Sequence, residues 1–460
     1  MCCYTEGYAN SSGRNSVSPR ILAQAGSSGR AAAVLPKSHI AAQPDSLASL
    51  PWPEGTQVLR FENLEGAILV GGKLVPVSGR DTSGTFVLDT GAGFLALDLG
   101  LARLLGVADS APVAAAVAIA ARPLARLELG GLQMDQVSPV ITVDAGVIRR
   151  VTGRPVLGLL GQALFRDRVV VLDYLEGTLA ILPPEPPTVS PPPATQPPNL
   201  PSSALSSQVA GLALSATAVA VPFRLAGDGK MLVSAWVTSR SGRPAGKLTL
   251  IVDTGATKSV FFRAALDRRL PRWKAWPALR GLGAPTLTGD EGAELVRVTG
   301  VELLAPGGNV ARSGMDAAVL AGGLGEMLAN DVDEPVDGLL GYSFLKHYRI
   351  VLDFPRGLLW LDPSRGDVLD RLEEYSHPGL QLESMGEEIR IFAVAEGSPA
   401  ARAGVRAGDE LVAIDGELVS DVDVVTVARR LEGAPGTTLW LKLRRGRREW
   451  TCRLVRKRLL

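Results

Sequence analysis

Two short apolar runs in this chain each lead into the same acidic turn. Residues 86–88 are Phe-Val-Leu, residues 250–252 are Leu-Ile-Val, and Asp-Thr-Gly-Ala follows each run. Short apolar runs that stop at a glycine-containing turn are typical of buried strands. We therefore expect two buried strands, one delivering the carboxylate of Asp89 and the other that of Asp253 to a strand end.

A second pair of segments repeats further along the chain. Gly-Leu-Leu-Gly occupies 158–161 and 338–341, an offset of 180 residues, and each copy precedes an apolar strand that ends in aspartate. Asp89 and Asp253 are 164 residues apart, so the second copy carries 16 additional residues between its two motifs. Similar segments that recur in the same order indicate an internal duplication.

The residues of the acidic turns suit a pair of facing carboxyls. Two carboxyls a few ångström apart cannot both ionise, so one holds a proton while the other accepts one from water. The threonine hydroxyl can brace the turn, and the glycine permits a close approach that a side chain would block. We expect Asp89 and Asp253 to be catalytic. The expected supports of the catalytic turns are Thr90, Gly91, Thr254 and Gly255.

Asp-Thr-Gly-Ala followed much later by Gly-Leu-Leu-Gly and a short helix resembles the retropepsin-like aspartic proteases. Because both copies lie in one polypeptide, as in pepsin-like enzymes, the resemblance implies a mainly β fold with two pseudo-twofold-related β-barrel lobes, at 55–182 and 208–365. It implies an aspartic-type endopeptidase in which Asp89 and Asp253 activate water, with no metal and no organic cofactor.

The two copies differ in the segment expected to cover the cleft. Residues 279–284, Leu-Arg-Gly-Leu-Gly-Ala, contain Gly281 and Gly283, as expected of a mobile hairpin. The corresponding stretch of the first copy, 111–116, has no glycine. We therefore expect one working flap, in the second lobe.

The duplication ends after Asp362, and a third unit follows. The pattern Gly-Ser-Pro-Ala, Ala-Gly, Gly-Asp-Glu-Leu and Asp-Gly within 397–416 resembles a PDZ domain of the bacterial processing-protease kind, an α+β module at 366–460. The resemblance implies a carboxylate-binding loop and a facing helix that receive the C-terminus of a peptide or protein. Docking of the module within its own chain is the alternative. The implied peptide-binding residues are Gly379, Leu380, Gln381, Leu382, Val424 and Val427.

Composition bounds the class of protein. The chain has 460 residues, 46% of them hydrophobic, which suffices for about three domains with real cores. The net charge of +1 gives no basic field that would attract nucleic acid. The three cysteines, Cys2, Cys3 and Cys452, have neither the spacing of a disulfide framework nor that of a zinc site.

The remaining segments carry no catalytic motif. Residues 1–54 are rich in Ser, Ala, Gly and Arg and lack hydrophobic periodicity, so we expect a disordered segment. The Pro-rich residues 183–207 predict an extended linker between the lobes. The start of the chain shows no clear signal peptide, and no apolar run reaches the roughly twenty residues of a membrane helix. The family resemblance favours an extracytoplasmic location.

Three hypotheses follow. The first is a monomeric aspartic endopeptidase that acts on peptide or protein substrates. The second is a catalytically inactive peptide-binding or scaffold protein of the same fold, favoured by the unequal flaps and by Gly93, where the copies diverge. The third is a homodimer that pairs like lobes of two chains. We expect a monomer with no nucleic-acid partner and no membrane span.

Overall fold

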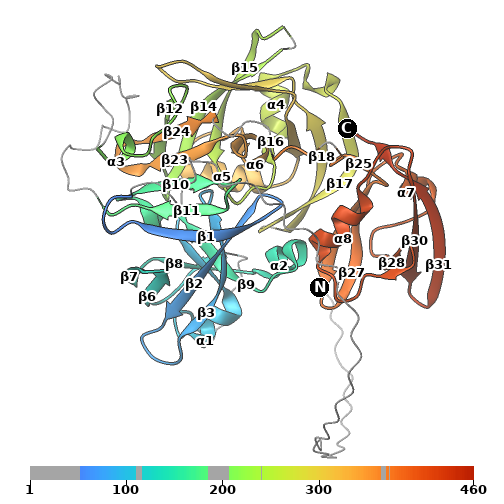
Figure 1. Ribbon diagram of the computed structural model, residues 1–460, viewed down its shortest axis with the longest axis horizontal. Helices are drawn as coiled ribbons and strands as arrows, with labels where there is room; N and C mark the ends of the chain where they lie inside the picture. Colours follow the sequence, from blue (N-terminus) through green and yellow to red (C-terminus); the bar gives the residue numbers. More distant parts are fainter. Residues whose placement is uncertain are drawn as a thin grey trace, which may run out of the picture. The chain divides into compact units, whose positions relative to one another are not determined.

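A computed structural model describes residues 52–109, 117–184, 207–239, 241–287, 289–363, 369–371 and 373–460. Over these residues the protein is mainly β, as expected, with short helices beside the sheets (Figure 1). Most of the expected N-terminal segment, the linker residues 185–206 and the first-copy counterpart of the flap at 111–116 lie outside the described residues.

The first copy of the duplication forms one set of strands. They are β1 (Gln57–Leu64), β2 (Ala67–Val75), β3 (Thr82–Asp89), β4 (Leu95–Asp98), β5 (Val117–Ile119), β6 (Leu124–Leu129), β7 (Leu132–Val137), β8 (Val140–Val143), β9 (Val156–Gly161), β10 (Val169–Asp173) and β11 (Thr178–Ile181). β3 pairs in parallel with β9, β9 pairs antiparallel with β4, and β4 pairs in parallel with β8. Asp89 therefore lies at the end of a strand that has neighbours on both sides.

The second copy repeats this order of pairings. Its strands are β12 (Val219–Pro222), β13 (Arg224–Ala226), β14 (Lys230–Thr238), β15 (Pro244–Val252), β16 (Ser259–Phe262), β17 (Ala278–Thr286), β18 (Gly289–Arg297), β19 (Gly300–Leu303), β20 (Val310–Ser313), β21 (Asp316–Leu320), β22 (Gly338–Leu340), β23 (Arg349–Asp353) and β24 (Leu358–Asp362). β15 pairs in parallel with β22, β22 antiparallel with β16, and β16 in parallel with β21. The duplication in sequence is thus a duplication in topology.

One pair of strands joins the two copies. β10 and β23 are antiparallel neighbours with Val171 opposite Val351, and both strands are buried along their whole length. Strands buried on both faces require continuous apolar runs, which explains the repeated apolar segments that follow each Gly-Leu-Leu-Gly. The core of the described residues continues across this junction, because Leu172 and Ile350 belong to one apolar cluster.

The helices are short and lie between strands. They are α1 (Leu99–Leu104), α2 (Gly146–Thr152), α3 (Ser207–Ala210), α4 (Arg263–Arg269), α5 (Leu324–Val332) and α6 (Tyr342–Leu345), with 3-10 helices η2 (Gln162–Phe165), η3 (Trp273–Ala275) and η4 (Phe354–Arg356). η2 and α6 are the short helices expected after the two Gly-Leu-Leu-Gly segments. Among the described residues, no helix has the length and apolar character needed to span a membrane.

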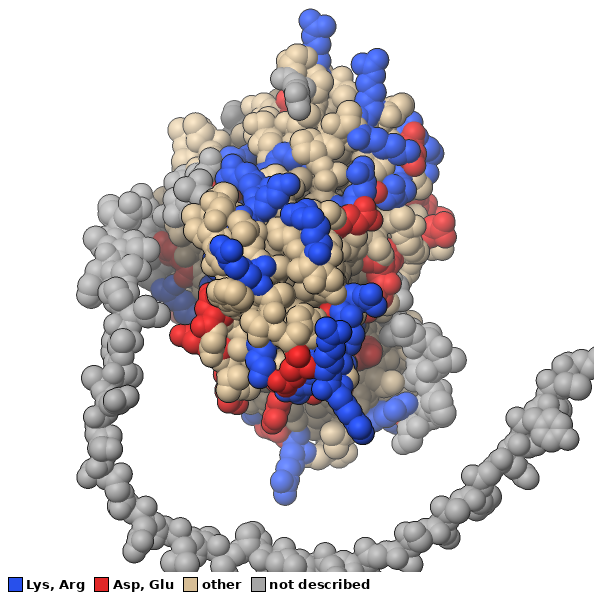
Figure 2. All heavy atoms as spheres, turned by 90° about the vertical axis from the view of Figure 1, so that its right-hand side faces the viewer, with Lys and Arg blue, Asp and Glu red and all other residues tan. Residues whose placement is uncertain are grey.

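The C-terminal domain has its own small sheet and core, drawn in orange to red in Figure 1. Its elements are β25 (Ser376–His377), β26 (Leu380–Met385), β27 (Glu388–Val394), α7 (Pro399–Arg402), β28 (Glu410–Ile414), β29 (Glu417–Leu418), α8 (Val424–Leu431), β30 (Thr438–Arg445), β31 (Arg448–Val455) and β32 (Lys457–Arg458). Basic and acidic side chains intermingle on the face shown in Figure 2. Within this domain, Arg444 pairs with Glu410 and Glu449.

Candidate active site

The two acidic turns meet, as the motif predicts. A Cβ placed on Gly91 would lie 2.6 Å from Cγ of Asp253, and a Cβ placed on Gly255 would lie 2.6 Å from Cγ of Asp89. Each glycine therefore makes room for the carboxyl of the opposite turn. A side chain at either position would push the two carboxyls apart.

Each carboxyl is held by its own turn. Oδ1 of Asp89 accepts hydrogen bonds from the N–H groups of Gly91, at 2.9 Å, and Ala92, at 3.1 Å. Oδ1 of Asp253 accepts hydrogen bonds from the N–H groups of Gly255, at 2.8 Å, and Ala256, at 3.0 Å. One oxygen of each carboxyl is thus fixed, and the other is available to the partner carboxyl or to a bound molecule.

The threonines lock the two turns together. The Thr90 N–H donates to Oγ1 of Thr254 at 3.1 Å, and the Thr254 N–H donates to Oγ1 of Thr90 at 3.1 Å. Each hydroxyl donates in turn to a carbonyl across the junction, Thr90 to Val252 and Thr254 to Leu88, both at 2.9 Å. Both threonines are buried, so all of these polar groups find partners within the junction.

The Gly-Leu-Leu-Gly segments support the turns from behind. A Cβ on Gly161 would lie 2.0 Å from the Phe94 carbonyl oxygen, and a Cβ on Gly341 would lie 2.4 Å from that of Lys258. Only glycine lets the backbones approach so closely. The residue after each glycine donates its N–H to a carbonyl of the acidic turn, Gln162 to Ala92 and Tyr342 to Ala256.

Burial controls the protonation of the two carboxyls. Burial raises the pKa of Asp89 above its ordinary value, against the opposing effect of hydrogen bonds from Asp253 and the turn. Burial and the adjacent charge of Asp89 raise the pKa of Asp253 well above its ordinary value. Because two carboxyls this close cannot both ionise, the pair retains a proton and can donate one proton while accepting another.

The carboxyls open into a cavity of about 1090 Å³, with apolar side chains over most of its wall. Its lining comes from all three parts of the chain, including Ile148 of α2, Leu287 at the turn between β17 and β18, and Val425 of α8. An apolar cavity with a few convergent polar groups is the usual form of a binding site.

A buried lysine close to the carboxyls was missed by the sequence analysis. Lys230 is 3% exposed, lines the cavity, and pairs with Asp228 at 2.7 Å and Asp331 at 3.4 Å. Its positive charge is among the influences that lower the pKa of Asp89. Lys230 stands at the start of an apolar strand that carries no motif, so nothing in the local sequence pointed to it.

The divergence of the first copy at Gly93 has a packing cause. A Cβ on Gly93 would lie 2.0 Å from Oδ2 of Asp228, the partner of Lys230. Glycine at this position therefore admits a carboxylate from the second copy to the cavity wall. The absence of a side chain here makes room for a polar group and does not by itself favour an inactive cleft.

The expected flap is the hairpin of β17 and β18. Gly283 lines the cavity, whereas Gly281, with φ of +76°, is not part of its wall. Both glycines face the C-terminal domain: a Cβ on Gly283 would lie 2.5 Å from the Phe392 ring, and one on Gly281 would lie 2.9 Å from Cγ of Glu396. These glycines thus allow close packing of the hairpin on another domain.

The residues expected to bind peptide in the C-terminal domain divide into two groups. Gln381, Leu382 and Val424 line the cavity that holds the carboxyls. Gly379, with φ of +92°, lies against Ser398, and its N–H donates to His377. Leu380 and Val427 are buried in the core of the domain and are not part of the cavity wall. The cavity-facing residues of α8 that the sequence analysis missed are Val425 and Arg429.

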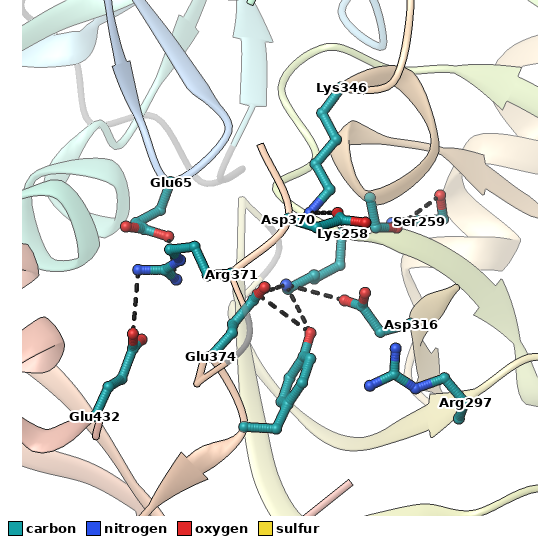
Figure 3. A network of polar contacts seen from close by, with 12 residues as sticks. Glu65, Lys258, Ser259, Arg297, Asp316, Lys346, Asp370, Arg371, Glu374 and Glu432 are labelled. Atoms are coloured by element: carbon teal, nitrogen blue, oxygen red, sulfur yellow. Dashed lines mark hydrogen bonds and ion pairs between the residues drawn. The ribbon is translucent and has the colours of Figure 1, made fainter. Parts of the chain in front are cut away.

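A polar network borders the cavity (Figure 3). Lys258, five residues after Asp253, contacts Asp316 and Tyr375, each at 2.9 Å, and Glu374. Burial alone would lower the pKa of the Lys258 amine, but these three neighbours raise it well above its ordinary value. The network therefore keeps a charged amine at the edge of the cavity.

A second part of this network joins the first copy of the duplication to the C-terminal unit. Arg371 pairs with Glu65 at 2.8 Å and with Glu432 at 3.3 Å (Figure 3). Arg429 of α8 also pairs with Glu65, at 2.7 Å. Burial raises the pKa of Glu432 to about 7, against the opposing charge of Arg371. Among the described residues, no group of three His, Cys, Asp or Glu side chains is placed to hold a metal ion.

Comparisons with known proteins identify the C-terminal domain. Residues 390–445 match the family model described as "PDZ domain". The chain is 46% identical over 54 residues to the chloroplastic carboxyl-terminal-processing peptidase 3 of Arabidopsis thaliana, covering 12% of this chain and 10% of that protein. It is 34% identical over 97 residues to the chloroplastic C-terminal processing peptidase of Tetradesmus obliquus, covering 20% of this chain and 21% of that protein.

Two solved structures are similar to parts of this chain of different length. The PDZ domain of a carboxy-terminal protease from Vibrio cholerae in complex with peptide matches 18% of this chain and 94% of its own, with 21% identity and a TM-score of 0.17. An aspartic proteinase from Irpex lacteus matches 69% of this chain and all of its own, with 12% identity and a TM-score of 0.41. At these scores the matches carry no functional argument.

The comparisons correct the expected enzyme class. Both curated relatives are named for processing at the carboxyl terminus and neither is named an aspartic endopeptidase, so the expectation of an aspartic-type endopeptidase is contradicted. The chain spans 10% and 21% of the lengths of these two relatives. What holds is that the chain contains a PDZ domain and is similar, over part of its length, to peptidases.

Proposed function

We propose that this protein is a PDZ-containing peptidase that holds a polypeptide in the cavity between the two copies of the duplication. One observation carries this proposal: Gln381, Leu382 and Val424 of the PDZ domain line the same cavity as Asp89 and Asp253. Recognition of a polypeptide and chemistry on it would then take place in one continuous site. The peptidase names of the curated relatives support the class of activity.

For the fold, we propose that the two copies are the lobes of a pepsin-like arrangement, with boundaries at 55–182 and 208–365. The support is the identical order of strand pairings around β9 and β22, together with the antiparallel junction of β10 and β23. Related lobes joined in this way bring equivalent turns to one interface. A cleft between the lobes follows from that symmetry.

For the site, we propose that the activity depends on Asp89 and Asp253, with Thr90, Gly91, Thr254 and Gly255 as their supports. The carboxyl of Asp253 is buried, that of Asp89 is half-buried, and the pKa of each is raised, so the pair can exchange protons with a bound molecule.

For the partners, we propose polypeptides whose carboxyl ends are received at the PDZ domain. PDZ domains add an extended peptide as a strand to a sheet edge and bind its terminal carboxylate through backbone N–H groups. β26 presents Gln381 and Leu382 to the cavity, and α8 faces it with Val424 and Val425. Such a groove favours an apolar side chain near the carboxyl end of the bound chain.

A second candidate function is peptide binding without hydrolysis. The observation that favours it is the contact between the PDZ domain and the hairpin of β17 and β18, because a covered cavity restricts the passage of substrate and product. This candidate predicts saturable peptide binding and no cleavage products.

The test is incubation of the purified chain with unfolded polypeptides and with peptides that end in a free or an amidated carboxyl group, followed by mass spectrometry. We expect cleavage, and we expect Asp89→Asn and Asp253→Asn to lower its rate by about 10² or more, since each removes one half of an acid–base pair. Asp167→Asn, at an exposed acid, is the matched control.

Two outcomes would count against the proposal. Binding of the peptides without cleavage at any pH would favour the second candidate function. Full cleavage by a folded Asp89→Asn or Asp253→Asn protein would show that the activity lies elsewhere in the cavity.

A further inference from the structure

We propose that Gln381 of the PDZ domain is a positioning residue for the hairpin of β17 and β18, so that the PDZ domain completes the cleft. The hairpin, residues 278–297, is called the flap below. This inference rests on the proposed function for its kinetic consequence, and its structural consequence can be measured whether or not the protein hydrolyses peptides.

The first observation is a pair of hydrogen bonds between Gln381 and the flap backbone. The Gly283 N–H donates to Oε1 of Gln381 at 2.8 Å, and Nε2 of Gln381 donates to the Gly283 carbonyl at 3.1 Å. The side-chain amide thus satisfies both polar groups of one flap residue, as a neighbouring strand would. Glutamate lacks the donor that this arrangement needs, and alanine lacks both groups.

The second observation is that the flap backbone lies directly against the PDZ domain. The Glu396 N–H donates to the Arg280 carbonyl at 2.9 Å. Gly283 packs on the Phe392 ring, where a Cβ would approach to 2.5 Å, and a Cβ on Gly281 would lie 3.0 Å from the Val394 carbonyl oxygen. The flap glycines therefore fit this docked position, and larger residues would not.

The third observation is a separate contact at the tip of the flap. Leu287, Ile148 of α2 and Val425 of α8 pack on the same apolar cluster. Beside them, Arg150 of α2 pairs with Asp290 of the flap at 2.9 Å and with Glu383 of β26 at 2.9 Å. The flap is thus held along its length by the PDZ domain and by α2.

These contacts tie the shape of the cavity to the PDZ domain. The flap residues from Leu282 to Leu287 line the cavity that contains Asp89 and Asp253. A flap that loses its support at Gly283 would move more freely over the carboxyls, and bound polypeptide would be held less well. The structure therefore gives the PDZ domain a part in the cleft itself, in addition to the recognition of carboxyl ends.

The experiment compares Gln381→Ala and Gln381→Glu with the wild-type chain by amide hydrogen exchange and by peptide cleavage. We expect exchange at Gly283 to become about tenfold faster or more in Gln381→Ala, because the acceptor of the Gly283 N–H is lost. In Gln381→Glu we expect a smaller increase, because the carboxylate keeps the acceptor but turns an oxygen without a proton towards the Gly283 carbonyl. We expect KM for a short peptide to rise severalfold with a smaller change in kcat, as for a residue that acts through the position of the flap.

The matched control is Gln133→Glu on the exposed face of β7, which makes the same chemical change away from the cleft. It should alter neither exchange at Gly283 nor KM. Unchanged exchange at Gly283 in folded Gln381→Ala protein would overturn the proposal. Faster exchange without peptide cleavage in the wild-type chain would support the role of Gln381 while counting against the proposed peptidase activity.

Discussion

Thr90 and Thr254 donate their backbone N–H groups to each other's side-chain hydroxyls, each at 3.1 Å, although they lie 164 residues apart in the sequence. This exchange fixes how the two acidic turns meet, and with them the carboxyls of Asp89 and Asp253. The geometry of the candidate site therefore depends on a buried contact between the two copies of the duplication.

The first prediction concerns this contact. Thr90→Val and Thr254→Val should each lower the free energy of unfolding by about 1–3 kcal/mol, because each leaves buried N–H and carbonyl groups without partners. Urea unfolding measures the change. The double variant should lose less than the sum of the single losses, because the two hydroxyls share one network. Thr90→Ser keeps the hydroxyl and should lose far less, whereas equal losses from Val and Ser would contradict the assignment.

The second prediction concerns the stability of the protein at neutral pH. A carboxyl whose pKa is raised on folding binds more protons in the folded than in the unfolded state, so its contribution to stability declines as pH rises above about 3.8. Asp253→Asn cannot ionise and should raise the free energy of unfolding at pH 7 by about 1 kcal/mol or more. The gain should shrink towards pH 3.

Urea titrations of wild type and variant at several pH values measure this difference. Asp89→Asn should give a smaller gain, because the pKa of Asp89 is raised less than that of Asp253. If Asp253→Asn instead destabilises the protein at pH 7, then burial and the charge of Asp89 do not raise the pKa of Asp253 in the wild-type chain.

The parts of the site that could be predicted from the sequence are those fixed by short-range geometry. A strand, an aspartate and a glycine in one turn determine a local structure, and two copies at related positions imply that the turns meet. The topology of the strands around β9 and β22 follows from the same repetition. The PDZ domain could be identified because its pattern spans several turns and a helix.

Contacts between distant segments could not be predicted in this way. Lys230 and Asp228 reach the cavity through the approach of the second copy to Gly93, which no local pattern encodes. On α8 the sequence pointed to Val427, but the helix turns Val427 into the core and Val425 towards the cavity. The predicted enzyme class was wrong for a different reason. A short motif specifies the structure of a turn and does not specify the reaction of a whole protein.

The third prediction concerns Lys230. Lys230→Met should lower the free energy of unfolding by about 1–3 kcal/mol, because it leaves the half-buried carboxylate of Asp228 without its charged partner. Asp228→Asn added to Lys230→Met should restore part of the loss, since the uncompensated charge is then removed as well. Urea unfolding of the single and double variants tests this coupling. If the two substitutions change the free energy of unfolding additively, Lys230 and Asp228 do not stabilise each other.

Lys230→Met should also change the pH at which Asp89 loses its proton. Lys230 lowers the pKa of Asp89, so its removal should raise that pKa. The protonated form of Asp89 would then persist to higher pH in Lys230→Met than in the wild-type chain. An NMR or infrared titration of the carboxyls reads out this shift without requiring an activity assay.

The last prediction concerns His377, which stands before the expected carboxylate-binding loop of the PDZ domain. Its Nδ1 accepts a hydrogen bond from the Gly379 N–H at 3.0 Å, and burial lowers the pKa of the imidazole to about 4. Protonation of the His377 ring would remove the acceptor of this hydrogen bond and place a positive charge in a buried site. Between about pH 6.5 and 4 the unfolded state therefore binds more protons, and the contribution of His377 to stability falls as the pH falls.

His377→Asn offers an oxygen that can accept the same hydrogen bond and cannot ionise in this range. We expect the wild-type chain to lose roughly 2 kcal/mol more than this variant between pH 6.5 and pH 4, because each unit of pKa difference corresponds to about 1.4 kcal/mol. Urea unfolding measures the difference, and an NMR titration of the imidazole gives its pKa directly. Titration of His377 near 6.5 in the folded chain would show that the ring is not held as a neutral acceptor of the Gly379 N–H.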